Sequence, residues 1–131
     1  DHHGRFTAQA GTPERLVQDG YTHFCLDEVE GALWTAGKHR FALPEHLRVP
    51  QVKETARAEF DMAMQRLERR LDDREFVTDQ GFTVPDLLFG HCAGWAISAK
   101  FDLPGGVVGA YFERLRSRPA FNAAMRRGAS V

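Results

Sequence analysis

The stretch from Gly81 to Leu88 fixes the start of a helix, and the rest of the chain is arranged around it. Thr83 suits the N-cap, because its hydroxyl can accept a hydrogen bond from the otherwise unpaired N–H of Asp86. The Asp86 carboxylate can in turn reach back to the N–H of Thr83, which makes a capping box. Pro85 falls in the first turn, where no N–H is needed. The sequence therefore predicts a structural N-cap at Thr83 and Asp86, with no catalytic role.

Apolar residues recur at helical spacing before this segment. A first helix is predicted from a Thr12 cap to about Ala36, and residues 37–44 are expected to form a connecting loop. The clearest amphipathic pattern follows Val49 and Pro50. Its apolar residues step by threes and fours, whereas its other face carries a mixed-sign row typical of a solvated surface; the apolar positions are Val52, Ala56, Phe60, Met64, Leu67 and Leu71.

The capped helix is followed by a break at residues 102–106, and the pattern after the break predicts two more helices. The last one is expected to begin near Ser117 or Arg118, with Pro119 in its first turn, and to end at Gly128. No strand-like alternation and no hairpin dipeptide lies between apolar runs. The fold class is therefore predicted to be all-α, a bundle of five to six helices.

The first eleven residues differ from the rest, because residues 1–11 are polar and show no helical period. We interpret them as a tail or the remnant of an interdomain linker, and residues 12–131 as one helical domain. A length of 131 residues suffices for one domain with its own core.

Charge and composition exclude several classes of function. The chain has 17 basic and 18 acidic residues and a formal charge of -1, so no electrostatic field draws in nucleic acid or an anionic membrane. No apolar run approaches the roughly 20 residues of a membrane span, and the start of the chain lacks the apolar core of a signal peptide. We therefore expect a soluble, cytoplasmic protein with no nucleic-acid or membrane partner.

The reactive side chains form no recognisable catalytic or metal motif. Cys25 and Cys92 each fall within an apolar helical pattern, which favours buried free thiols over a disulfide. His91 and Cys92 are neighbours and so point about 100° apart around a helix, which excludes a contacting nucleophile–base pair. No histidine, cysteine or carboxylate spacing matches a metal site. Trp34 and Trp95 remain as residues that could border a ligand pocket.

The order of these features resembles the C-terminal domain of bacterial glutathione S-transferases, from about Thr12 to Arg127. In that family a Ser/Thr-x-x-Asp box begins the central helix, a Tyr-x-x-Arg-like helix follows, and an Arg-Pro-Ala-like step opens the last helix. All three are matched here, with Pro85 where the family commonly has Ala. The matching segments are Phe82-Thr83-Val84-Pro85-Asp86-Leu87, Tyr111-Phe112-Glu113-Arg114-Leu115 and Arg118-Pro119-Ala120.

The resemblance implies a role in binding the second substrate of a transferase. Glutathione would be the co-substrate, bound mainly by a thioredoxin-like N-terminal domain that this chain does not include, so the chain alone would be a fragment without activity. The helical domain would supply the wall of a pocket for a small apolar electrophile and much of a homodimer interface. By register, the wall involves Glu30, Leu33, Trp34 and Trp95. The bacterial beta class commonly has a His near the position of Glu30, and this departure leaves the transferase class open.

Two other functions fit the same sequence. Helical domains of this kind also serve as non-catalytic protein-interaction modules in larger assemblies. The chain could also be an unrelated helical bundle that binds a small molecule. No metal is expected under any of the three.

Overall fold

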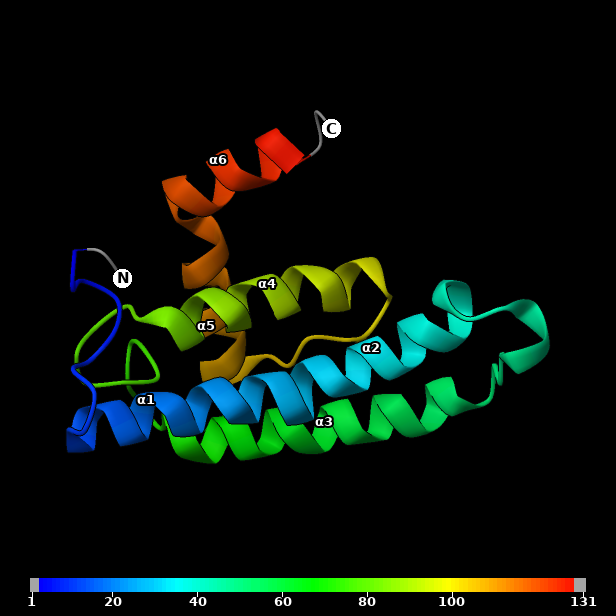
Figure 1. Ribbon diagram of the computed structural model, residues 1–131, viewed down its shortest axis with the longest axis horizontal. Coiled ribbons are helices and arrows are strands. Elements are labelled where there is room, and N and C mark those ends of the chain that lie inside the picture. The colour runs from blue at the N-terminus through cyan, green and yellow to red at the C-terminus, as the bar shows by residue number, and fades with distance from the viewer. Residues whose placement is uncertain (1–2, 129–131) are drawn as a thin grey trace.

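The computed structural model describes residues 3–128, and over that range it contains helices and connecting segments but no strand (Figure 1). The predicted all-α fold is therefore confirmed. The six α-helices of the described residues are α1 (Pro13–Phe24), α2 (Gly31–Gly37), α3 (Val52–Leu71), α4 (Val84–Ser98), α5 (Gly106–Ser117) and α6 (Pro119–Gly128).

The first two α-helices form one rod, because the π-helical segment Cys25–Glu30 joins α1 to α2 without a break. The rod begins at the predicted cap, where the Thr12 hydroxyl accepts a hydrogen bond from the Arg15 amide at 3.2 Å. Pro13 occupies the first helical position, where its missing N–H costs nothing.

The rod does not end near Ala36, as the sequence predicted, but continues through a second π-helical segment, Lys38–Ala42. Gly37 lies within this continuous stretch and against two aromatic rings, because a Cβ there would be 3.3 Å from the Phe41 ring and 3.5 Å from the Trp95 ring. The predicted loop at residues 37–44 is thus wrong for its first six residues. Glycine usually marks a helix end, but here its missing side chain admits two aromatic rings.

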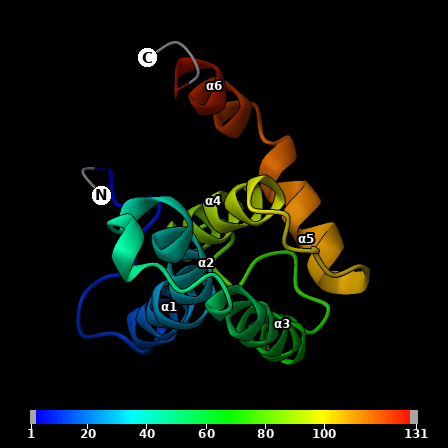
Figure 2. The same ribbon diagram turned by 90° about the vertical axis from the view of Figure 1, so that its right-hand side faces the viewer.

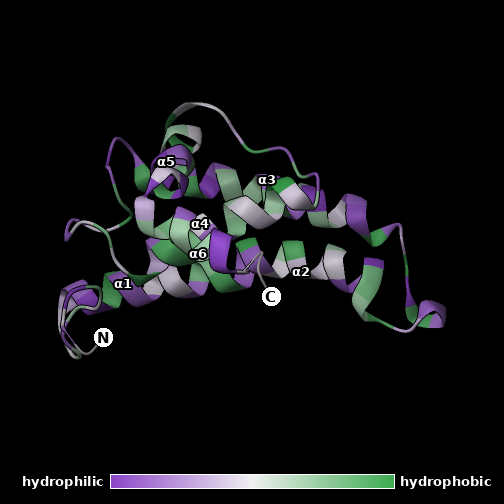
Figure 3. Cartoon of the chain, turned by 90° about the horizontal axis from the view of Figure 1, so that it is seen from above, coloured by the Kyte–Doolittle hydropathy of each residue, from purple (hydrophilic) through white to green (hydrophobic). Residues whose placement is uncertain are grey.

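The rod and α3 lie side by side in opposite directions, and α4 packs on the rod and runs in the same direction as it does (Figure 1). α5 crosses α4 and also packs on α3, while α6 packs on α5 and projects away from the other helices (Figure 2). The helices carry alternating hydrophobic and hydrophilic stretches (Figure 3), as amphipathic helices of a bundle do. Large core side chains come from the rod, α3, α4 and α5 and include Leu33, Phe60, Leu67, Phe89, Tyr111 and Phe112.

The described part of the predicted tail packs on the helices. The Phe6 carbonyl accepts hydrogen bonds from the Val84 amide at 3.1 Å and from the Gln18 side-chain amide at 3.2 Å. The oxygen of the same Gln18 side chain accepts from the Ala8 amide at 2.7 Å. Residues 3–11 are thereby held at the starts of α1 and α4.

Candidate ligand-binding site

Asp86 anchors the base of α4 by accepting four hydrogen bonds in a fully buried position. Its Oδ2 accepts the Thr83 amide at 2.8 Å and the Thr83 hydroxyl at 3.1 Å. Its Oδ1 accepts the Val77 amide at 3.1 Å and the Tyr111 hydroxyl at 2.8 Å. The Asp86 amide donates to the Thr83 carbonyl at 3.1 Å. These bonds fix where α4 begins and how it lies against α5.

Three side-chain pairs join the rod to α4, one after another along their shared direction. The rings of Phe24 and Phe89 lie 6.1 Å apart between centroids. The thiol sulfurs of Cys25 and Cys92 lie 3.9 Å apart. At the far end, the rings of Trp34 and Trp95 meet edge to face at 6.3 Å. The structure therefore brings together the two tryptophans that the sequence placed 61 positions apart.

The four residues predicted to form a pocket wall lie at different depths. Trp34 is 44% exposed, and Trp95 is half-buried. Glu30 is half-buried and ends the π-helical segment Cys25–Glu30. Leu33 is fully buried in the core. Trp34, Trp95 and Glu30 thus reach the surface, the two tryptophans in contact with each other, and Leu33 lies in the core.

His91 lies beside Trp95 but was not among the predicted site residues. It is exposed, and its ring lies 6.2 Å from the Trp95 ring, one turn earlier along α4. From the sequence, His91 was considered only as a possible base for its neighbour Cys92. The spacing of four residues from Trp95 is the signal that could have found it, because such side chains share a helix face.

A cavity of about 220 Å³ lies beside Trp95. Aromatic rings form much of its wall, and Arg40 and Lys53 supply positive charge; neither forms an ion pair with a described residue. A flat apolar or aromatic molecule could stack against such a wall. The lining residues are Ala36, Gly37, Arg40, Phe41, Lys53, Trp95, Ser98, Ala99 and Phe101.

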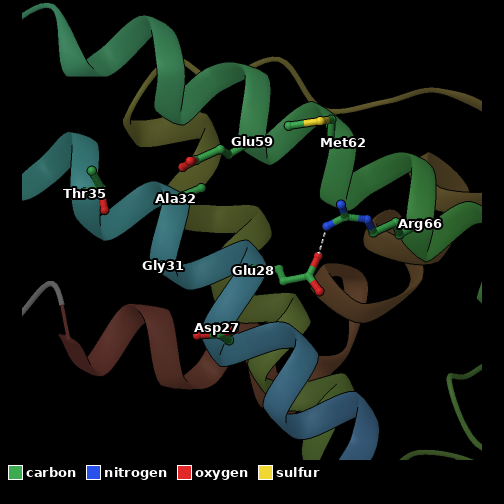
Figure 4. A pocket seen from close by; sticks show the side chains of 8 residues that line it. All are labelled: Asp27, Glu28, Gly31, Ala32, Thr35, Glu59, Met62 and Arg66. Carbon is green, nitrogen blue, oxygen red and sulfur yellow. Dashed lines mark hydrogen bonds and ion pairs between the residues drawn. The ribbon is translucent and has the colours of Figure 1, made fainter.

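A second, more polar cleft of about 440 Å³ lies at the surface between the rod and α3 (Figure 4). Asp27, Glu28 and Glu59 give it acidic character, and its one basic side chain, Arg66, is ion-paired to Glu28. None of the four predicted wall residues lines it. Of the four, Trp95 alone lines the cavity beside it, and of these two spaces that cavity is the better candidate for an apolar ligand.

Among residues 3–128, no group of three or more His, Cys, Asp or Glu side chains is arranged to hold a metal ion. None of the helices that the structure describes combines the length and the apolar character needed to cross a membrane.

The comparisons with known proteins rest on structure. No protein-family model matches the sequence, and no curated protein sequence matches it either. A search of solved structures matches this chain to a bacterial beta class glutathione S-transferase of Sphingomonas chungbukensis, with a TM-score of 0.80 and 22% sequence identity. The match covers 100% of this chain and 62% of that chain.

The match defines the class of fold. The chain has the fold of the C-terminal helical domain of a bacterial glutathione S-transferase, as the order of its motifs implied. It spans 62% of the length of that solved transferase.

Proposed function

We propose that this chain is the electrophile-binding helical domain of a glutathione S-transferase-like enzyme. The observation that carries the proposal is the contact between Trp34 and Trp95 next to an aromatic-lined cavity, on a fold shared with a bacterial transferase. Glutathione would be the co-substrate, held mainly by a thioredoxin-like domain on the same polypeptide. Its thiolate attacks the electrophile, and the helical domain holds the electrophile in position.

Each predicted wall residue has a distinct role in this proposal. Trp34 and Trp95 present ring surface to the electrophile, and Leu33 supports the Trp34 side from the core. Glu30 stands where the bacterial beta class commonly has a His, so this enzyme would place a carboxylate near the reacting thiol. The proposal includes a homodimer that works in the cytoplasm.

The test uses the protein with both domains and two substitutions, Trp34→Ala and Trp95→Ala. Each substitution removes aromatic contact surface that contributes about 1 kcal/mol or more to binding of the electrophile and none to binding of glutathione. We therefore expect KM for 1-chloro-2,4-dinitrobenzene to rise at least about five-fold. KM for glutathione should stay within about two-fold, because glutathione lies on the other domain. Met62→Ala on α3, which removes a 46% exposed apolar side chain, is the matched control. Equal losses for both substrates would contradict the proposal.

A second candidate, a non-catalytic interaction module, is favoured by an apolar groove of about 460 Å³ between α4 and α6. Leu87 and Met125 line it and are 59% and 57% exposed, as expected of a surface that a protein partner covers. The two functions are separated by glutathione binding. Failure of the protein with both domains to bind glutathione at millimolar concentration would exclude the transferase and leave the interaction module.

A further inference from the structure

We propose that Cys25 and Cys92 form a redox site, in which oxidation joins the two thiols in an intramolecular disulfide between the rod and α4. The inference rests on the contact between the two side chains and does not depend on the proposed transferase activity. The two residues are 67 positions apart in the chain, so the fold alone brings them together.

The geometry of the pair is close to what a disulfide requires. The sulfurs lie 3.9 Å apart, and both cysteines are free. A disulfide bond measures about 2.05 Å, so the sulfurs must approach each other by about 1.9 Å. Because folding has already brought the thiols together, little further chain entropy is lost when they are joined.

The surroundings of the pair restrict it to one partner. Cys25 is 0% exposed and Cys92 is 2% exposed, so neither is placed to form a disulfide with a second protein molecule. The contact between Phe24 and Phe89 holds the two helices together immediately beside the thiols. Cys25 is also the first residue of a π-helical segment, a wider turn that occurs often at functional sites. Local adjustment of this turn is the movement that would bring its sulfur nearer to Cys92.

The reaction is a thiol–disulfide exchange with a small organic disulfide as oxidant. The Cys92 thiolate attacks one sulfur of that disulfide, whose S–S bond breaks and releases one small thiol. The Cys25 thiolate then attacks the Cys92 sulfur of the mixed disulfide and releases the second small thiol. The two cysteine protons end on the two small thiols, and the two electrons from the cysteines reduce the oxidant.

Burial determines the order and the rate of the two steps. We assign the first step to Cys92, which lies on α4, the helix whose local opening would admit the oxidant. The hydrogen bond with Cys92 and burial both raise the pKa of the Cys25 thiol, which therefore stays protonated until the second step. The first step requires local opening of α4, so oxidation is slow in the native protein.

The disulfide would act on the neighbouring tryptophans. Cys92 lies one turn before Trp95 on α4, and Cys25 lies on the rod that carries Trp34. A bond between the cysteines would fix the separation of the two helices one turn from Trp95 on α4 and nine residues from Trp34 on the rod. The redox state of the pair would therefore limit how far Trp34 and Trp95 can move apart.

The experiment incubates the reduced, native chain with oxidised glutathione, then alkylates it in denaturant and measures its mass. We expect a product two hydrogen atoms lighter than the reduced protein, with no alkylated cysteine and with the Cys25 and Cys92 peptides linked. The closed loop of about 67 residues should raise Tm by roughly 10 °C, an effect reversed by dithiothreitol. Cys92→Ala is the control, because it leaves Cys25 without its partner and should give no lighter product.

Three outcomes would overturn the proposal. Both thiols could remain alkylatable after long exposure of the native protein, while the denatured protein is oxidised. A stable glutathione adduct could accumulate in place of the internal disulfide. A disulfide that lowers Tm would show that the bond is incompatible with the native packing of the rod and α4.

Discussion

The hydroxyl of Tyr111 donates a 2.8 Å hydrogen bond to Oδ1 of Asp86, and both side chains are fully buried. This bond joins α5 to the base of α4. It explains why one carboxylate serves two purposes, since the oxygen that faces Tyr111 is not the one that caps Thr83. The position of α4, and therefore that of Trp95, depends on the pair.

Replacing Asp86 with Ala should destabilise the domain more than the loss of an ordinary cap would. Four hydrogen bonds end on this carboxylate, and the substitution leaves buried donors without partners. We expect a loss of about 3 kcal/mol or more in the free energy of unfolding, measured by urea denaturation. Asp86→Asn, which keeps one acceptor oxygen, should lose less. A loss below about 1 kcal/mol for Asp86→Ala, the size of a single exposed cap, would contradict the four-bond arrangement.

Tyr111 should make stability depend on alkaline pH. Burial and then the neighbouring Asp86 carboxylate raise the pKa of its hydroxyl well above the usual value of about 10. A folded-state pKa above the unfolded one means that its contribution is complete below pH about 10 and is lost as pH rises. The stability of the native sequence relative to Tyr111→Phe should therefore fall above pH about 10, by up to about 1.4 kcal/mol per pH unit. Parallel curves for the two proteins in urea titrations would refute this.

Two helical glycines should respond oppositely to replacement by alanine. A Cβ at Gly109 in α5 would lie 2.6 Å from the carbonyl oxygen of Pro104, a backbone atom that cannot swing aside. We expect Gly109→Ala to cost about 1–3 kcal/mol. Gly20 in α1 is the matched control, since a Cβ there meets no atom within 4 Å. Gly20→Ala should gain about 0.5–1 kcal/mol from helix propensity. Thermal unfolding that shows the same sign for both would contradict the packing around Gly109.

The sequence predicted the features that local chemistry decides. The Thr12 and Thr83 caps and the positions of Pro13 and Pro119 marked helix starts correctly, because caps act within one turn. The apolar spacing of Val52–Leu71 identified α3, because helical periodicity is also set by residues close together in the chain. The last helix runs to Gly128, which is also the last described residue.

Features that depend on helix packing were not predictable in this way. The contact between Cys25 and Cys92 requires the rod and α4 to run in the same direction, and nothing in either helix alone states that. The extension of the rod past Ala36 places Gly37 against the Trp95 ring, a contact between distant parts of the chain that the local sequence does not indicate. Even so, the resemblance to the transferase family selected Trp34 and Trp95 before their contact was known.

Gly37→Ala should weaken ligand binding in the cavity beside Trp95 without lowering the stability of the fold. The new Cβ would lie 3.3 Å from the Phe41 ring, which must move; that side chain is 60% exposed and can do so at little cost. Alanine also favours the helix by about 1 kcal/mol, so the free energy of unfolding should be unchanged or slightly higher.

The volume available to a ligand in the cavity should decrease, because the added methyl group enters a space of only about 220 Å³ that Gly37, Phe41 and Trp95 line. In the protein with both domains, we expect Kd for an apolar electrophile such as 1-chloro-2,4-dinitrobenzene to rise about three-fold or more, the size of one misplaced methyl contact. Gly94→Ala on α4, the helix that carries Trp95, is the matched control, since a Cβ there would meet only the Phe121 ring, at an ordinary contact distance of 3.9 Å. If Gly37→Ala bound the electrophile as tightly as Gly94→Ala did, the cavity beside Trp95 would not be where the electrophile binds.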